Sequence, residues 1–256
     1  MKIAITGKGG VGKTTFSALL CRAYFDSGYQ VLAVDADPDA NLAATLRFPK
    51  PEEIIPLSQM DELIEERTGA KPGSYGAMFK MNPTVADLPE KIWVEHFGIR
   101  LIVMGGVKKG GGGCVCPESV LLKTLIQHLI LYRQDVVIMD MEAGIEHLGR
   151  ATAGAVNVFI VVVEPGRRSM ETAYRIRALA KEIGISQVYA IGNRVKDTGE
   201  KIFIQESMPD FMILGYLPYD EKVVEADRKN YFLWEYCPEV YAEVEKIRKK
   251  IEELRS

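Results

Sequence analysis

The sequence predicts a doubly wound α/β fold, in which helices cover both faces of a mainly parallel sheet. Apolar runs of strand length alternate with helical patterns, and these runs lie near residues 2–6, 30–35, 99–104, 135–140, 157–163, 187–192 and 211–216. Such alternation is typical of a parallel sheet that is buried on both faces. A glycine-rich segment joins the first run to the first helical pattern, which is where many α/β proteins bind phosphate.

The glycine-rich segment has the spacing G-x-x-x-x-G-K-[ST] of a phosphate-binding loop. It consists of Gly7, Lys8, Gly9, Gly10, Val11, Gly12, Lys13, Thr14 and Thr15. Glycines let backbone N–H groups point at phosphate, and Lys13 would place a positive charge beside the β- and γ-phosphates. We expect Thr14 to offer its hydroxyl to Mg²⁺ and Thr15 to donate to the α-phosphate. The segment therefore predicts a P-loop NTPase that binds ATP or ADP together with Mg²⁺.

Lys8 directly follows the first glycine of this loop, at a position where ordinary phosphate-binding loops accept many residues. A lysine there resembles the signature lysine of the deviant Walker A family, which includes nitrogenase iron protein and the septum-positioning and partitioning ATPases MinD and ParA. In that family two subunits face each other across their nucleotides, and this lysine contacts phosphate in the partner's site. The resemblance implies a homodimer controlled by ATP. The simpler alternative is a solvated surface lysine.

Two further segments resemble the switch regions of the same family, and each follows an apolar run. Asp37 precedes Pro38, as does the switch I aspartate that orients or activates the attacking water near Mg²⁺. With Lys8 and Lys13, Asp37 completes the catalytic residues that the resemblance implies. Asp140 ends the predicted Walker B strand and, with Thr14 and Asp37, would hold Mg²⁺, partly through water. The N–H of Gly144 would sense the γ-phosphate. Three other carboxylates at strand ends carry no assigned role, since they also suit capping or solvation: Asp35, Asp39 and Glu142.

Two later strand ends resemble the segments that contact the base in this family. Asn193 follows the run 187–192, and its amide can both donate to and accept from the edge of adenine. Pro218 follows the run 211–216 and is similar to the loop that closes over the base. The alternative for both residues is an ordinary turn at the end of a strand.

Cys114 and Cys116 lie between four glycines at 110–113 and a helix predicted from Pro117 to about Tyr132. The N-terminus of a helix favours the thiolate form of cysteine, which is the form that binds metal ions. Two thiolates leave a tetrahedral or square-planar ion half coordinated, whereas a symmetric dimer supplies four sulfur atoms to one ion. The pair therefore predicts a metal site, for Ni²⁺ or Zn²⁺, that two subunits share.

A disulfide or a structural role in the core suits these two cysteines less well than a metal site. A disulfide within Cys-x-Cys would close a short, strained ring, and a packed core position is unexpected directly after four glycines. The two remaining cysteines are interpreted as structural, because Cys21 falls within the first helical pattern and Cys237 within a turn before Pro238.

Together, the deviant loop, both switch segments and the sequence Gly-Gly-x-Cys-x-Cys resemble the CooC-type family of nickel-maturation ATPases, and the similarity runs the length of the chain. The resemblance implies an ATP-hydrolysing, dimerising metallochaperone that assists nickel insertion into a client enzyme. The client would be carbon monoxide dehydrogenase or a related nickel enzyme of the acetyl-CoA synthase type. Thiolates also bind Zn²⁺ and Cu⁺, so the choice of nickel depends on the resemblance alone.

Three alternative functions belong to other classes. An iron–sulfur reductase ATPase of the nitrogenase iron protein type also uses two cysteines, but that family places the second just after Walker B, where this chain has Met141, Glu142 and Ala143. A positioning ATPase of the MinD or ParA type would be stimulated by lipid or DNA and would not need a metal ion at the cysteines. A small-molecule P-loop ligase or kinase would require a metabolite and would not require the cysteines.

The length of 256 residues and the 47% hydrophobic content predict one domain, 1–256, with a less regular insertion at about 47–98 that contains several prolines. The 32 basic and 35 acidic residues give a formal charge of −3, which does not favour nucleic acid as a partner. No apolar run reaches the length of about 18 residues that spans a membrane. The last helical pattern, 240–254, mixes both charge signs, so we expect it to pack on the sheet. The expected location is the cytoplasm.

Overall fold

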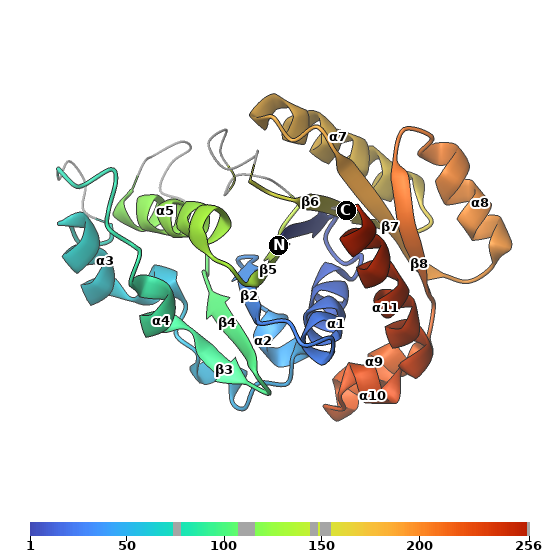
Figure 1. The fold of residues 1–256 in the computed structure, drawn as a ribbon, viewed down its shortest axis with the longest axis horizontal. Coiled ribbons are helices and arrows are strands. Elements are labelled where there is room, and N and C mark those ends of the chain that lie inside the picture. The colour runs from blue at the N-terminus through green and yellow to red at the C-terminus, as the bar shows by residue number, and fades with distance from the viewer. Residues whose placement is uncertain (74–77, 107–115, 144–147, 149–154, 255–256) are drawn as a thin grey trace.

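The computed structural model describes residues 1–73, 78–106, 116–143, 148 and 155–254. The strands in these ranges are β1 (Lys2–Gly7), β2 (Val31–Ala36), β3 (Val94–His96), β4 (Ile99–Val103), β5 (Val136–Met141), β6 (Val158–Val163), β7 (Val188–Val195) and β8 (Met212–Pro218). They form an eight-stranded sheet in the order β3-β4-β2-β5-β1-β6-β7-β8 (Figure 1). All pairs are parallel except that of β3 with β4. The doubly wound, mainly parallel fold is thereby confirmed.

Seven of the eight strands coincide with the predicted apolar runs. The four strands β1, β2, β5 and β6 are buried at every residue, which explains why they consist of nearly continuous apolar sequence. The short edge strand β3 was not predicted. It has three residues, none of them fully buried, so it gives neither a long apolar run nor a clear alternation.

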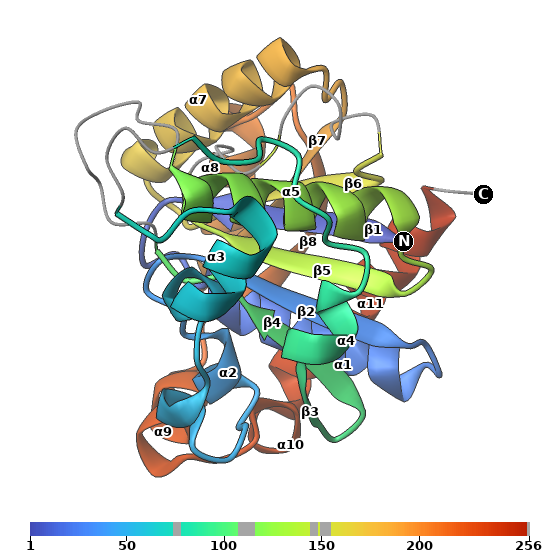
Figure 2. The same cartoon turned by 90° about the vertical axis from the view of Figure 1, so that its left-hand side faces the viewer.

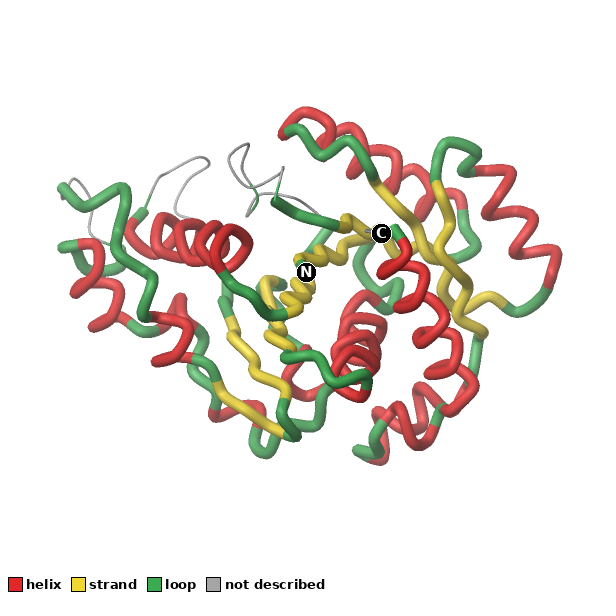
Figure 3. The backbone as a smooth tube through the Cα atoms, in the orientation of Figure 1, coloured by secondary structure: helices red, strands yellow, loops and turns green. Residues whose placement is uncertain are grey.

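Helices cover both faces of the sheet, as the tube in Figure 3 shows. The described helices are α1 (Lys13–Asp26), α2 (Leu42–Thr45), α3 (Asp61–Thr68), α4 (Leu88–Ile92), α5 (Pro117–Tyr132), α7 (Arg167–Ile183), α8 (Thr198–Ser207), α9 (Glu221–Lys229), α10 (Leu233–Tyr236) and α11 (Pro238–Glu253), with short 3₁₀ turns η1 (Pro51–Glu53) and η2 (Leu57–Gln59). One buried cluster joins α1, α2 and α11 to one face of the sheet, and a second joins α3, α5, α7 and α8 to the other.

The predicted insertion and the last helix both have defined positions in this fold. The region 47–98 contains η1, η2, α3, α4 and β3, and α3 packs beside α5 on one face of the sheet, as Figure 2 shows. Helix α11 packs against β8 and α1, and its apolar stripe at Val240, Val244, Ile247 and Ile251 is buried. The prediction that this helix covers the sheet is therefore confirmed. Among the described helices, none combines the length and apolar character that crossing a membrane requires.

Candidate nucleotide site

The phosphate-binding loop leaves the carboxyl end of the central strand β1, at the point where the chain order of the strands reverses. Two of its glycines are required by their surroundings. Gly7 has φ +150°, and a Cβ there would overlap the carbonyl oxygen of Val162 in β6. Gly12 has φ +89° and precedes α1, and a Cβ there would overlap the amide nitrogen of Asn193. The loop therefore follows a backbone path that other residues could not adopt without strain.

Lys13 and Thr14 begin α1, directly after this loop. Lys13 is 7% exposed, and its Nζ lies 3.8 Å from Oδ2 of Asp37. Asp37 itself is half-buried and follows the end of β2. The structure thus brings the predicted loop lysine and the predicted switch I aspartate together at the carboxyl edge of the sheet.

Asp140 lies in β5 at the same edge and is completely buried. Its Oδ1 accepts a hydrogen bond from the Ser17 hydroxyl at 3.1 Å, whereas its Oδ2 is buried with no hydrogen-bond partner. Burial raises the pKa of Asp140 to about 6, and the hydroxyl groups of Thr14 and Ser17, followed by the charge of Lys13, act in the opposite direction. A buried carboxylate oxygen without a partner is costly unless a ligand satisfies it.

Asp35 faces Asp140 as its register partner on the adjacent strand, and it is also completely buried. Its carboxylate accepts hydrogen bonds from the backbone N–H of Leu42 at 2.8 Å and from that of Asp37 at 3.3 Å. Burial raises its pKa to about 7, against the effect of these hydrogen bonds. Asp35 therefore ties both ends of the switch I turn to β2, a role that its position in the sequence did not reveal.

This group of oxygen atoms has the chemistry that Mg²⁺ prefers, since Mg²⁺ binds few protein ligands, mainly carboxylates and hydroxyls, and keeps several waters. The unpartnered Oδ2 of Asp140 is the observation that supports the fit. Thr14, Asp37 and Asp140 are the residues predicted to hold the ion, and the structure places all three at one edge of the sheet. Their roles as ligands stay predictions.

The predicted base-binding residues lie on the neighbouring strands. Asn193 in β7 is 8% exposed, and its amide nitrogen donates to the carbonyl of Val11 at 2.7 Å. This hydrogen bond connects β7 to the phosphate-binding loop. Pro218 ends β8 beside Val195. The bond to Val11 uses one of the two N–H groups of the Asn193 amide. Contact with adenine stays a prediction for Asn193 and for Pro218.

Of the predicted metal-binding cysteines, Cys116 lies within the described residues and Cys114 lies outside them, as does Gly144 of the predicted switch II. Cys116 is the N-cap of α5: its sulfur accepts the backbone N–H of Ser119, and the Ser119 hydroxyl accepts the Cys116 N–H at 3.2 Å. Cys21 and Cys237 are completely buried, as expected for structural cysteines. Among the described residues, no three histidine, cysteine, aspartate or glutamate side chains form a group that could hold a metal ion by themselves.

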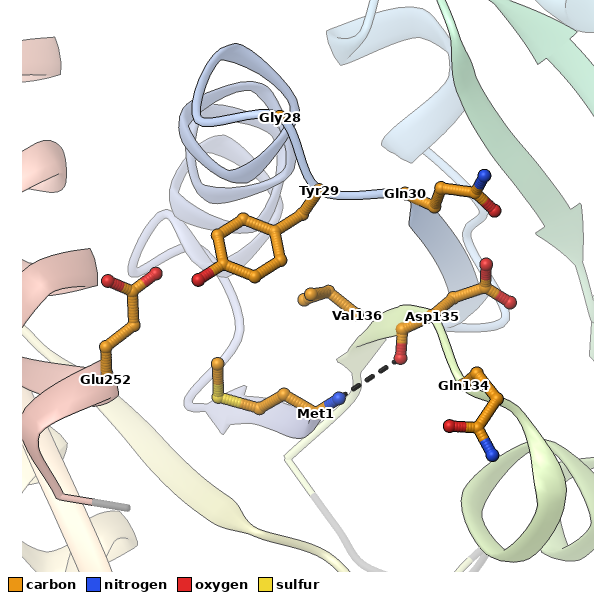
Figure 4. A pocket seen from close by; sticks show the side chains of 8 residues that line it. All are labelled: Met1, Gly28, Tyr29, Gln30, Gln134, Asp135, Val136 and Glu252. Carbon is orange, nitrogen blue, oxygen red and sulfur yellow. Dashed lines mark hydrogen bonds between the residues drawn. The ribbon is translucent and has the colours of Figure 1, made fainter. Parts of the chain in front are cut away.

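A depression of about 530 Å³ lies at the opposite, amino-terminal edge of the sheet (Figure 4). It is lined by Met1, Gly28, Tyr29, Gln30, Gln134, Asp135, Val136 and Glu252. The amino group of Met1 donates to the carbonyl of Asp135 at 3.1 Å across its floor. The depression is lined by none of the predicted nucleotide-binding residues, and it lies away from the carboxyl edge at which open α/β sheets bind ligands.

Comparison with known families decides the class of the protein. The family described as the CobQ/CobB/MinD/ParA nucleotide binding domain matches residues 2–231. The chain belongs to this family. It is 44% identical over 240 residues to the carbon monoxide dehydrogenase accessory protein CooC of Rhodospirillum rubrum, an alignment that covers 93% of this chain and 91% of CooC. It is 49% identical over 230 residues to an ATP-binding protein of Methanocaldococcus jannaschii, with 89% of this chain and 88% of that protein covered.

Solved structures of MinD share the fold. The septum site-determining protein MinD of Pyrococcus horikoshii, complexed with Mg-ADP, superimposes with a TM-score of 0.70 at 21% identity, over 100% of this chain and 97% of that one. At this level of identity the likeness shows the fold alone. The predicted resemblance to the deviant Walker A family and to the CooC-type ATPases is thus confirmed at the level of family and fold.

Proposed function

We propose that the protein is an ATP-hydrolysing, dimerising metallochaperone that assists nickel insertion into carbon monoxide dehydrogenase or a related nickel enzyme. The observation that carries this proposal is the 44% identity to CooC, which extends over 93% of the chain. The carboxyl edge of the sheet supports the ATPase part, and the position of Cys116 at the start of α5 supports the metal-binding part.

The residues of the phosphate-binding loop would hold the nucleotide. Backbone N–H groups and the N-terminus of α1 would receive the phosphates, and Lys13 would exchange its contact with Asp37 for one with the β- and γ-phosphates. Asp37, once released, would orient the attacking water. Bound Mg²⁺ supplies neutralisation of phosphate charge, and Thr14, Asp37 and Asp140 would hold it, partly through water.

The partner subunit would complete the site. Lys8 lies within the phosphate-binding loop and is half-buried. In the proposed dimer, its charge would reach phosphate in the other subunit. Positive charge that meets a transferring phosphoryl group is a large contribution to catalysis in this chemistry. Hydrolysis would remove the γ-phosphate that holds the two subunits together.

Nickel is the cargo in this proposal. Cys114 and Cys116 of two subunits would supply four thiolates to one ion. The exchange of hydrogen bonds with Ser119 would hold Cys116 in place at the start of α5, where its sulfur could meet a metal ion.

Two routes connect the nucleotide site to the cysteines. Helix α5 begins at Pro117, next to Cys116, and leads into β5, which carries Asp140. On the other side, the chain enters the cysteine segment after Gly106, which lies against switch I: a Cβ on Gly106 would be 3.1 Å from the Cβ of Pro38. A change at the nucleotide site would therefore reach the segment that carries the cysteines from switch I through Gly106 and from β5 through α5.

Anaerobic titration with Ni²⁺ and Zn²⁺ tests the metal-binding part. With ATP and Mg²⁺ present, we expect one ion per two subunits in the wild type and no cysteine-dependent binding in the double variant Cys114→Ser with Cys116→Ser. The matched control is Cys237→Ala, which removes a buried thiol outside the proposed site and should bind the ion normally. Full metal binding by the double variant would show that the site assignment is wrong.

A further inference from the structure

Arg47 ends helix α2 in the left-handed conformation, with φ +60°. The N–H of Arg47 donates to the carbonyl of Ala44, and that of Phe48 donates to the carbonyl of Ala43. This hydrogen-bond pattern is a Schellman motif, whose left-handed position is usually glycine because other residues are strained there. Arg47 occupies this position despite the strain, and its side chain makes contacts that offset part of it.

The Arg47 side chain is 6% exposed and connects α2 to α9. Its Nη1 donates to the carbonyl of Ala44 in α2 at 3.0 Å, its Nη2 to that of Ala226 in α9 at 2.9 Å, and its Nε to that of Tyr231 at 2.9 Å. Figure 2 shows α2 lying beside α9. An ion pair with Asp227 at 3.6 Å adds little, because that carboxylate is 81% exposed. The rigid guanidinium fork thus holds two helices together through main-chain carbonyls.

The two helices follow different parts of the nucleotide site. Helix α2 follows the switch I turn, and the N–H of its first residue, Leu42, is held by Asp35. Helix α9 follows residues 218–220, the segment that the sequence predicts to close over the base and that we call the base loop. Asp220 caps α9 and accepts the N–H of Lys222 at 2.9 Å. Any displacement of the base loop that moves α9 is therefore passed to α2 through Arg47.

We propose that Arg47 is a positioning residue that couples occupation of the base loop to the conformation of switch I. The inference rests on the proposed ATPase function. Binding of the base orders α9, Arg47 transmits that order to α2, and the switch I turn with Asp37 is held in place.

Hydrogen exchange with Mg-ADP or Mg-pyrophosphate as probes tests this coupling in the full-length protein. In the wild type, we expect both probes to slow exchange in residues 7–20. Only Mg-ADP, and not Mg-pyrophosphate, should slow exchange about tenfold in both 219–230 and 41–48. In Arg47→Ala, ADP should still slow exchange in 7–20 and 219–230 but have no effect in 41–48. The control is Arg67→Ala, which removes an arginine that binds the Thr84 carbonyl and Asp87 away from α9.

The outcomes separate the coupling from general damage. Retention of the ADP effect at 41–48 in Arg47→Ala would overturn the inference, and so would its loss in Arg67→Ala as well. Loss only in Arg47→Ala, with partial recovery in Arg47→Lys, would support it. If ADP failed to slow exchange at 7–20 in the wild type, the proposed nucleotide function itself would be wrong, and the inference would fail with it.

Discussion

At the amino edge of the sheet, where β4 and β5 begin, charged side chains neutralise one another. Arg133 forms a 2.7 Å ion pair with Asp135 and a second with Glu90, and Arg100 lies 3.4 Å from Asp135. Both guanidinium groups also lie over the ring of Trp93, at 5.4 and 4.9 Å. These charges satisfy each other within the chain, so their role is to hold the fold together.

At the carboxyl edge the balance is different. Asp35 and Asp140 face each other while completely buried, and Asp37 lies beside them. In the described part of the chain, Lys13 is the cation that the structure pairs with this group, through Asp37 at 3.8 Å. Among the described residues of the carboxyl edge, the buried carboxylates outnumber the cations that pair with them. This imbalance indicates the functional edge, because a ligand such as Mg²⁺ with phosphate can supply the missing positive charge.

The largest effect expected from this difference concerns the lysines of the two edges. Lys13→Ala should lower the kcat of ATP hydrolysis by about 100-fold or more, because it removes the charge that stabilises the transferring phosphate. Lys2→Ala at the amino edge removes hydrogen bonds to the carbonyls of Arg133 and Asp135 and should change kcat less than about twofold. Steady-state phosphate release measures both. Normal turnover in Lys13→Ala would show that the phosphate-binding loop is misinterpreted.

A second contrast concerns the glycines at the two edges. Gly7→Ala should lower the free energy of unfolding by about 2–4 kcal/mol, since it adds both left-handed strain and overlap with the Val162 carbonyl. Gly28 at the amino edge has φ +84° and open space around it, so Gly28→Ala should cost only about 1 kcal/mol. Urea denaturation compares the two variants. If both variants lost the same free energy of unfolding, the close approach of Gly7 to β6 would not affect the cost of the substitution.

The smallest effect expected is at the charge cluster of the amino edge. Arg133→Ala should lower the free energy of unfolding by about 1–3 kcal/mol, because the Asp135 side chain, 6% exposed, loses one of its cations. Nucleotide affinity should not change, since the cluster lies at the opposite edge from the phosphate-binding loop. Urea denaturation and ADP titration of this variant check both statements. A clear loss of ADP affinity would contradict the separation of the two edges.

The sequence predicted the strands well, because a buried parallel strand needs continuous apolar residues. The glycine spacing of the loop also agrees with the structure, in which Gly7 and Gly12 lie where a side chain would overlap its neighbours. The sequence did not predict β3, whose three partly exposed residues have no periodic signal. It also gave no role to Asp35, since a carboxylate at a strand end looks the same whether it binds a ligand or a backbone N–H. Arg47 carries no local signal either, because its partners at Ala226 and Tyr231 are about 180 residues away.

For the site, too, the sequence predicted some features and missed others. The residues Lys13, Asp37 and Asp140 come together because their strands end at one edge, and parallel topology alone leads to that expectation. Asn193 reaches the loop from β7, but its observed hydrogen bond goes to the Val11 carbonyl, a contact that no motif indicates. Cys114 and Gly144 lie outside the described residues, so their roles stay predictions.

The most direct test of the account is the mass and nickel content of the protein in different nucleotide states. Anaerobic sedimentation of wild type and Lys8→Ala with Ni²⁺, in the presence of ATP or ADP and Mg²⁺, measures both quantities together. The account predicts that ATP gives a wild-type dimer with one Ni²⁺ per two subunits, and that Lys8→Ala stays monomeric with ATP. A wild-type protein whose mass and nickel content are the same with ATP and ADP would contradict it.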